Sequence, residues 1–369
     1  MNQLFRWDQT GLFLLALAAG ILPFAVPEVC AAALQEGLTL CSGPLLLSLF
    51  PFLVVSRLLV QCPESDLLAL PFRLAAWGIG IRTPCAARVL CIGFLGGFAP
   101  AASAAAQAVR TGQLTAEEAD AMLPACICSG PSFVVLTVGQ SLLGSAELGV
   151  LLFASQITAN YLTAALLNRF AGVRSVKPGS AAPASPAPPR LDEILADAAI
   201  TYCKLCGFIL FFRMLAAGAG ALLPAGAGTL CAILLEVCSG CDLASRTGQW
   251  GSLLCCAALS VQGLSVLLQV RTICPPEMTL RPLYRARMLH LPLSLALFYL
   301  LLPGGEADVF STLPARVLLM RRVPPDCALL VFAVCCMAAC TLRSGIRQVE
   351  QKQMARNAGG CCINSKTLL

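Results

Sequence analysis

The residues of this sequence that could carry chemistry are polar side chains inside long apolar segments. Such groups are costly in hydrocarbon, so each is expected to have a binding role or a protein partner. Glu236 is the most informative, because this acid lies in a short hydrophobic segment that ends with glycine. Its carboxylate would suit a cation or a polar solute. Alternatively, it neutralises Lys204 or Arg213 in the same half of the chain.

A second polar group surrounds the sequence Ser129-Gly130-Pro131-Ser132. Proline lacks a backbone N–H, so this sequence predicts a break within a helix that leaves backbone amides and carbonyls for a ligand. The alternative is a kink whose freed groups are satisfied by serine hydroxyls. Further along, Gln156 and Asn160 are four residues apart and share one helical face. They would hydrogen-bond a polar solute or join neighbouring helices.

The candidate solute site gathers these groups with the glycine-rich stretches and the polar residues at matching depths. The single histidine, His290, is included, although a lone histidine is more often a packed, hydrogen-bonded group than a proton relay. The candidate residues are Gly96, Gly97, Pro100, Ser129, Gly130, Pro131, Ser132, Gln156, Asn160, Glu236, Ser239, Gly240, Gln262, Gly263, Ser265, Gln269 and His290.

Cysteines are abundant, with 21 in the chain, but most lie in apolar runs and are read as small hydrophobic residues. Two C-x-x-C sequences, at Cys203 and Cys238, have metal or redox spacing. Burial in lipid opposes the thiolate that a metal needs, so we predict no metal and no cofactor. No nucleotide-binding or common hydrolase motif occurs, and no nucleophile lies beside a base, so we do not expect an enzyme.

The elements that must position these residues are membrane helices. Hydrophobic residues make up 58% of the 369 residues and charged residues 12%, and the mean hydropathy is +0.80. This composition excludes a disordered chain, a nucleic-acid module and an ordinary soluble enzyme. Ten apolar stretches stand out, at residues 11–27, 38–56, 89–109, 121–146, 148–168, 198–222, 226–241, 247–270, 288–305 and 327–342.

The basic residues favour eight full spans rather than ten. If stretches 89–109 and 226–241 enter the membrane and return on the same side, four basic regions fall on the cytoplasmic side. Both termini are then cytoplasmic. The exception is the loop that holds Arg316, Arg321 and Arg322. We also expect 288–305 to begin near the interface, where Arg287 would extend its charge toward water.

The chain divides into two similar halves. A Pro/Ala/Ser-rich linker at 173–192 separates a repeat at 1–172, which has an extra first helix, from a repeat at 193–342 and a basic tail at 343–369. Residues 52–59 resemble 208–215, and 130–136 resemble 263–269, with glycine-rich stretches between. Halves of opposite orientation, each with a re-entrant element, are typical of secondary transporters. Alternatively, the glycines and alanines serve close helix packing.

Several blocks of the chain resemble the sporulation integral membrane protein family (YlbJ-type), which is related to nucleoside-recognition or gate-domain membrane proteins. The section that carries most of the resemblance includes Gly96-Gly97-Phe98-Ala99-Pro100-Ala101. The other blocks are residues 112–119, 129–133, 154–161, 235–241, 262–266, 269 and 285–290. The resemblance implies a bacterial cell-membrane protein with a role in spore formation and transport of a small solute.

The sequence thus predicts an all-α polytopic membrane protein that binds or moves a small polar solute, nucleoside-like by analogy, together with a coupling cation. Its other partner is the lipid bilayer, with no nucleic acid, and assembly into a homo-oligomer is compatible with the sequence. The alternative is a membrane scaffold for spore or cell-envelope assembly that transports nothing.

Overall fold

The computed structural model describes residues 9–61, 69–171 and 190–302. Within these ranges every regular element is a helix, so the predicted all-α class is confirmed there. The linker, the last predicted stretch (327–342) and the basic tail lie outside the described residues, apart from the end of the linker at 190–192, where α9 begins.

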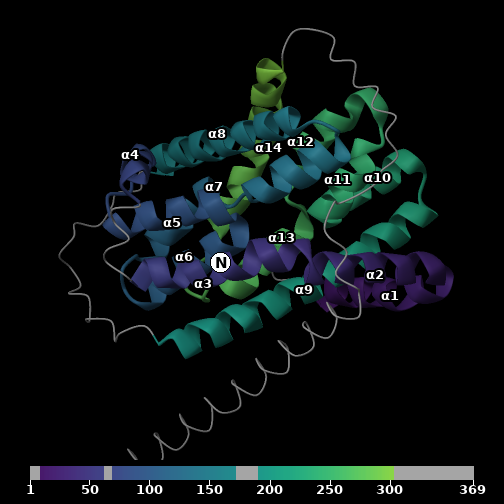
Figure 1. The fold of residues 1–369 in the computed structure, drawn as a ribbon, viewed down its shortest axis with the longest axis horizontal. Helices are drawn as coiled ribbons and strands as arrows, with labels where there is room; N and C mark the ends of the chain where they lie inside the picture. The colour runs from purple at the N-terminus through teal and green to yellow at the C-terminus, as the bar shows by residue number, and fades with distance from the viewer. Residues whose placement is uncertain (1–8, 62–68, 172–189, 303–369) are drawn as a thin grey trace, which may run out of the picture.

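In Figure 1 the helices of the first half are coloured purple to teal and those of the second half teal to yellow-green. The bounds in the first half are α1 (Gln9–Ala25), α2 (Pro27–Ser42), α3 (Pro44–Gln61), α4 (Leu70–Gly78), α5 (Pro84–Gly96), α6 (Phe98–Arg110), α7 (Ala116–Cys126), the π-helix η2 (Ser132–Leu142) and α8 (Ala146–Ala171). The second half contains α9 (Leu191–Leu222), α10 (Ala225–Leu235), α11 (Val237–Ser245), the short 3-10 helix η3 (Gly248–Trp250), α12 (Gly251–Val261), α13 (Gly263–Ile273) and α14 (Arg281–Leu301).

Among the described residues, four helical segments are long and apolar enough to cross a membrane. They are Pro27–Leu47, Ala146–Ala171, Leu191–Leu222 and Gly248–Ile273. Shorter apolar helices accompany them, including Pro84–Gly96 and Ala225–Leu235. Lengths of 21 to 32 residues match the roughly 20 residues needed to cross the hydrocarbon core. These helices are compatible with a membrane protein.

Two helix pairs fold back on themselves as hairpins. Helix α5 packs against α6 with its turn at Gly97, and α10 packs against α11 with its turn at Glu236. The second hairpin is tight, since a Cβ placed on Gly240 would lie 2.8 Å from the Cα of Ile233. These hairpins occupy the two stretches, 89–109 and 226–241, that the basic residues singled out.

Two other helices are broken between two segments. The predicted break at Ser129–Ser132 is confirmed, because α7 ends at Cys126 and η2 begins at Ser132. The break between α12 and α13 was not predicted. There Gln262 has a left-handed backbone with φ of 65°, and Gly263 follows with φ of 68°. Each break lies against a hairpin turn: Gly130 of the first break is close to Gly97, and Gly263 of the second break is close to Glu236.

The same order of elements occurs in both halves. A long helix (α3 or α9) precedes a hairpin, a broken helix and a final helix (α8 or α14). The first half adds α1, α2 and α4. The matching sequence blocks fall on equivalent elements: 52–59 lies in α3 and 208–215 in α9, while 130–136 covers the end of the first break and the start of η2, and 263–269 lies in α13.

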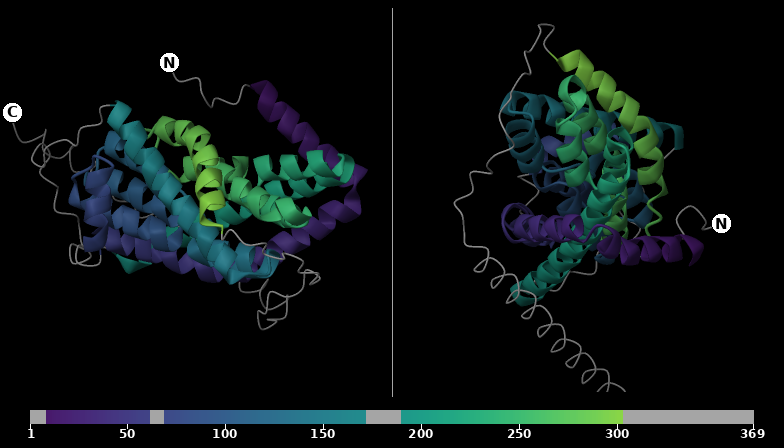
Figure 2. Two further views of the ribbon diagram at one scale, coloured as in Figure 1. Left: turned by 90° about the horizontal axis from the view of Figure 1, so that it is seen from above. Right: turned by 90° about the vertical axis from the view of Figure 1, so that its right-hand side faces the viewer.

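One predicted helix was wrong. The stretch 38–56 is divided at Gly43, where α2 ends and α3 begins. Pro44 lacks the N–H needed to continue α2, which explains the boundary. Most of helix α2 lies between the predicted stretches 11–27 and 38–56 and was not predicted; its Glu36 pairs with Arg213 of α9 at 2.7 Å. Figure 2 shows α1 and α2 as a V at one end of the molecule.

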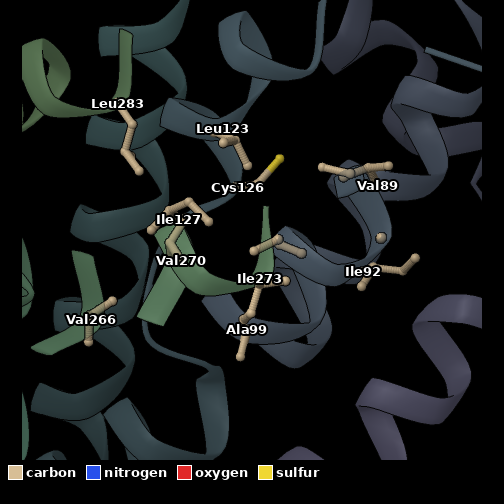
Figure 3. Packing of buried hydrophobic residues seen from close by; sticks show 14 of the residues in the cluster. Val89, Ile92, Ala99, Leu123, Cys126, Ile127, Val266, Val270, Ile273 and Leu283 are labelled. Carbon is tan, nitrogen blue, oxygen red and sulfur yellow. The ribbon is translucent and has the colours of Figure 1, made fainter. Parts of the chain in front are cut away.

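The core lies where α13 packs against the first half. Val266, Val270 and Ile273 of α13 lie among buried residues of α5, α6 and α7 (Figure 3). Helix α6 contains a series of buried alanines, whose small side chains let neighbouring helix backbones approach α6 closely. Arg57 of α3 also connects the two halves. Its Nε donates to Ser103 Oγ of α6 at 3.3 Å, and its Nη1 donates to Asp197 Oδ2 of α9 at 2.5 Å. The two halves therefore form one packed body around the hairpins.

Candidate functional site

A cavity of about 60 Å³ lies where the two hairpin turns meet the two helix breaks. It receives residues from α3, both hairpins, the first break, η2, α9 and α13. The lining residues are Leu45, Leu49, Leu95, Gly96, Phe98, Ser129, Gly130, Ser132, Phe133, Ile209, Glu236, Val237, Cys238, Val266 and Gln269. Six of the predicted residues line it: Gly96, Ser129, Gly130, Ser132, Glu236 and Gln269.

The first hairpin turn fits against the first helix break with no room for side chains. Gly97 has φ of 80°, and a Cβ placed on it would lie 2.7 Å from the nitrogen of Gly130. A Cβ on Gly130 would in turn lie 3.4 Å from the carbonyl oxygen of Gly96. Glycine at Gly97 is therefore required both by backbone conformation and by contact distance.

The second hairpin turn carries the acid, and its contacts exclude the predicted ion pair. Glu236 is 2% exposed and its carboxylate caps α11, accepting hydrogen bonds from the nitrogens of Cys238 (2.8 Å) and Ser239 (2.7 Å) and from Ser239 Oγ (2.9 Å). Among the described residues it forms no ion pair with Lys204, which is exposed on α9, or with Arg213, which pairs with Glu36. A negative charge at a helix N-terminus is stabilised by the helix dipole.

The second break brings two buried glutamines to the site. Gln262 Nε2 donates to the Leu259 carbonyl (2.8 Å) and to Ser129 Oγ (3.3 Å), which connects the two breaks. Gln269 Nε2 donates to Ser265 Oγ at 2.9 Å. Within the described ranges, the side-chain oxygens of both glutamines have no hydrogen-bond partner, although each residue is 1% exposed. A Cβ on Gly263 would lie 2.9 Å from the nitrogen of Glu236, so this turn and break are also in direct contact.

Three predicted site residues lie elsewhere, in a separate polar cluster between α8, α12 and α14. Gln156 donates to Ser260 Oγ at 3.0 Å, and Asn160 donates to the Ile127 carbonyl at 3.3 Å. His290 Nε2 contacts the Gln156 carbonyl at 3.2 Å. The amide N–H groups of Gln156 and Asn160 therefore join neighbouring helices, which is one of the two roles predicted for them. His290 is a packed, hydrogen-bonded group.

Arg287 belongs to this second cluster and does not extend its charge toward water as predicted. It is 8% exposed and donates to the carbonyls of Ile127 and, at 3.3 Å, Ser260. These carbonyls lie at the C-terminal ends of α7 and α12, where the helix dipoles favour a cation. Arg287 was misplaced because α14 begins at Arg281, earlier than the predicted stretch 288–305. The arginine is therefore inside the packed helix rather than before it.

The remaining predicted residues support the cavity without lining it. Pro131 precedes η2, Pro100 packs near Gly96, and Ser239 holds the Glu236 carboxylate. Gly240 permits the tight second hairpin, while Ser265 holds Gln269. The apolar wall formed by Leu45, Leu49 and Ile209 was not predicted, because apolar residues are common throughout the chain and nothing distinguishes these three.

The described residues contain no group of three or more potential metal ligands. Cys203 and Cys206 lie one turn apart on α9, and Cys238 and Cys241 lie on α11. In the part of the chain that the structure describes, these pairs do not form a potential metal site.

Comparisons with known proteins return nothing: no family model, no curated protein and no solved structure matches this chain.

Proposed function

We propose that this chain is an integral membrane protein of secondary-transporter type that binds and moves a small polar solute through the cavity between the hairpin turns. One observation carries the proposal: two hairpins and two broken helices from the two halves of the chain meet at one cavity that is lined in part by polar groups. Irregular backbone at membrane depth is tolerated where it is packed in protein or faces a cavity. Transporters place their solute sites at such breaks.

In the proposed topology each broken helix crosses the membrane, and each hairpin enters it and returns on the same side. The repeated order of elements supports an inverted repeat. A bacterial plasma-membrane location with both termini in the cytoplasm follows from the distribution of basic residues. A role in spore formation rests on the sequence resemblance.

Flux measurements test the proposal directly. The purified chain is reconstituted in lipid vesicles, and uptake is measured across a panel of small amines, amino alcohols, neutral polyols and nucleosides. We expect at least one solute to enter faster than in vesicles without protein, and Glu236→Gln to slow that flux. Asp242→Asn is the matched control, because Asp242 lies on the same helix, pairs with Arg246 and does not line the cavity. Flux of no panel member would contradict the proposal.

Cysteine labelling tests the position of the site. In a background without other native cysteines, single cysteines at positions 129, 132 and 238 are labelled from either side of the vesicle. We expect labelling that the transported solute prevents. Complete inaccessibility at all three positions would place the solute elsewhere.

A membrane scaffold is the second candidate, and the Gln156–Arg287 cluster favours it, because there polar groups connect helices instead of facing a cavity. A scaffold would lose assembly when Glu236 is replaced and would show no flux. A transporter would keep its fold and lose flux.

A further inference from the structure

We propose that the cavity selects a small organic cation, a primary ammonium group with a short apolar chain, over a nucleoside or a metal ion. This inference rests on the proposed function for the location of the site, and it names the chemistry of the solute. Three features of the cavity support it: its size, its hydrogen-bond acceptors and its apolar wall.

The volume limits the solute to a few atoms. A water molecule needs roughly 10–15 Å³ of such space, so about 60 Å³ holds on the order of four to six water-sized groups. Sites that enclose larger organic ligands typically measure several hundred Å³. A nucleoside exceeds this cavity, whereas an alkylammonium with a short chain fits it.

The polar end of the cavity has acceptors to spare. A carboxylate offers about four acceptor positions, and three of those of Glu236 are taken by Cys238 and Ser239. Gln269, which also lines the cavity, has an unpartnered side-chain oxygen on a residue that is 1% exposed. Ser129 and Ser132 add hydroxyl oxygens. An ammonium group carries three N–H donors and a positive charge, which complements a buried carboxylate and a free amide oxygen.

The rest of the wall distinguishes an organic cation from a metal ion. A hard metal cation needs oxygen ligands all around it, whereas the lining here is largely apolar, with Leu45, Leu49 and Ile209 on the long helices. Phe98 and Phe133 add aromatic rings, whose faces attract cations. An alkyl chain would replace water against the aliphatic side chains, while the ammonium group lies at the polar end.

Equilibrium binding tests this selectivity apart from transport. The full chain in lipid nanodiscs is titrated with propylammonium chloride by calorimetry, at an ionic strength held constant with sodium chloride. Propan-1-ol serves as the neutral compound of the same shape, and uridine as the nucleoside. We expect saturable binding of propylammonium at concentrations where propan-1-ol and uridine do not bind.

Two variants assign the binding to the cavity. Glu236→Gln should weaken propylammonium binding about tenfold or more, as expected for a lost hydrogen bond to a charged group, while Asp242→Asn should leave it unchanged. Gln269→Leu should also weaken binding with only a small fall in the unfolding temperature, because it removes one hydrogen bond to Ser265 together with a buried oxygen that has no partner among the described residues. If Glu236→Gln does not fold, Gln269→Leu carries the test.

The outcomes separate this inference from the proposed function. Equal binding of propylammonium and propan-1-ol, tighter binding of uridine, or sodium displacing propylammonium at the same site would overturn the ammonium selectivity. If a neutral solute or nucleoside is transported in vesicles but propylammonium does not bind, transport stands and the selectivity is wrong. Ammonium binding without flux of any solute would leave a binding site and remove the transport function.

Discussion

The two hairpin turns have similar surroundings and different chemistry. The turn at Gly97 lies against the break at Gly130, and the turn at Glu236 lies against the break at Gly263. At the first turn the residue has no side chain, and a positive φ and a nearby backbone require glycine. At the second turn an extended backbone leaves room for a carboxylate that caps the following helix. The fold thus repeats the geometry of the turn, while the second half alone supplies the acid.

The largest expected effect is on the first turn. Gly97→Ala places a Cβ 2.7 Å from the Gly130 nitrogen and forces a conformation that is rarely adopted outside glycine. We expect a loss of about 3 kcal/mol or more, which combines backbone strain with displacement of the break. The measurement is the free energy of unfolding in detergent micelles, by titration with denaturant.

Gly112→Ala is the control for that variant. Gly112 also has a positive φ, of 69°, but nothing lies within 4 Å of an added Cβ. Backbone strain alone should cost about 1 kcal/mol there. Equal losses for the two variants would mean that contact between hairpin and break contributes nothing to stability.

An intermediate effect is expected where one side chain serves both halves. Arg287→Gln removes a charged donor from carbonyls at the ends of α7 and α12, and we expect a loss of about 2 kcal/mol. Arg285→Gln, at an exposed position on the same helix, should change stability by less than about 0.5 kcal/mol. Thermal unfolding of both variants in nanodiscs checks the difference, and a smaller loss at Arg287 than at Arg285 would contradict it.

The smallest effect on stability is expected at the second turn. Glu236→Gln keeps an oxygen that can cap α11 but loses the charge, so we expect a loss of about 1 kcal/mol. The same variant should abolish most solute flux, which separates stability from function at this turn. A loss as large as that of Gly97→Ala, with flux per folded molecule unchanged, would make Glu236 a purely structural residue.

The predictable parts of the fold were those that glycine and proline mark. The break at Ser129-Gly130-Pro131-Ser132 is predictable because proline removes a backbone N–H and glycine allows unusual backbone conformations. The break at Gln262 is marked by Gly263 alone, without a proline, and a single glycine is tolerated within a helix; Gln262 itself adopts a left-handed backbone although glutamine is common within helices.

The candidate site was predicted only in part for a related reason. Depth in an apolar segment can be read from the sequence, and it correctly brought Ser129, Glu236 and Gln269 to one cavity. It could not separate them from Gln156 and His290, which lie at similar depth in their own segments but face α12 and α8 respectively. Which side of a helix meets which neighbour is decided by tertiary packing, and a single sequence carries no record of it.

The absence of space at Gly97 and Gly263 limits how this site can change in evolution. Neither position accepts a side chain without moving a backbone, so mutations there are removed by loss of folding before they can alter binding. New selectivity can therefore arise mainly from the wall that α3 and α9 provide, at Leu45, Leu49 and Ile209. We expect these three positions to vary among chains that keep the same hairpins and differ in the solute they accept.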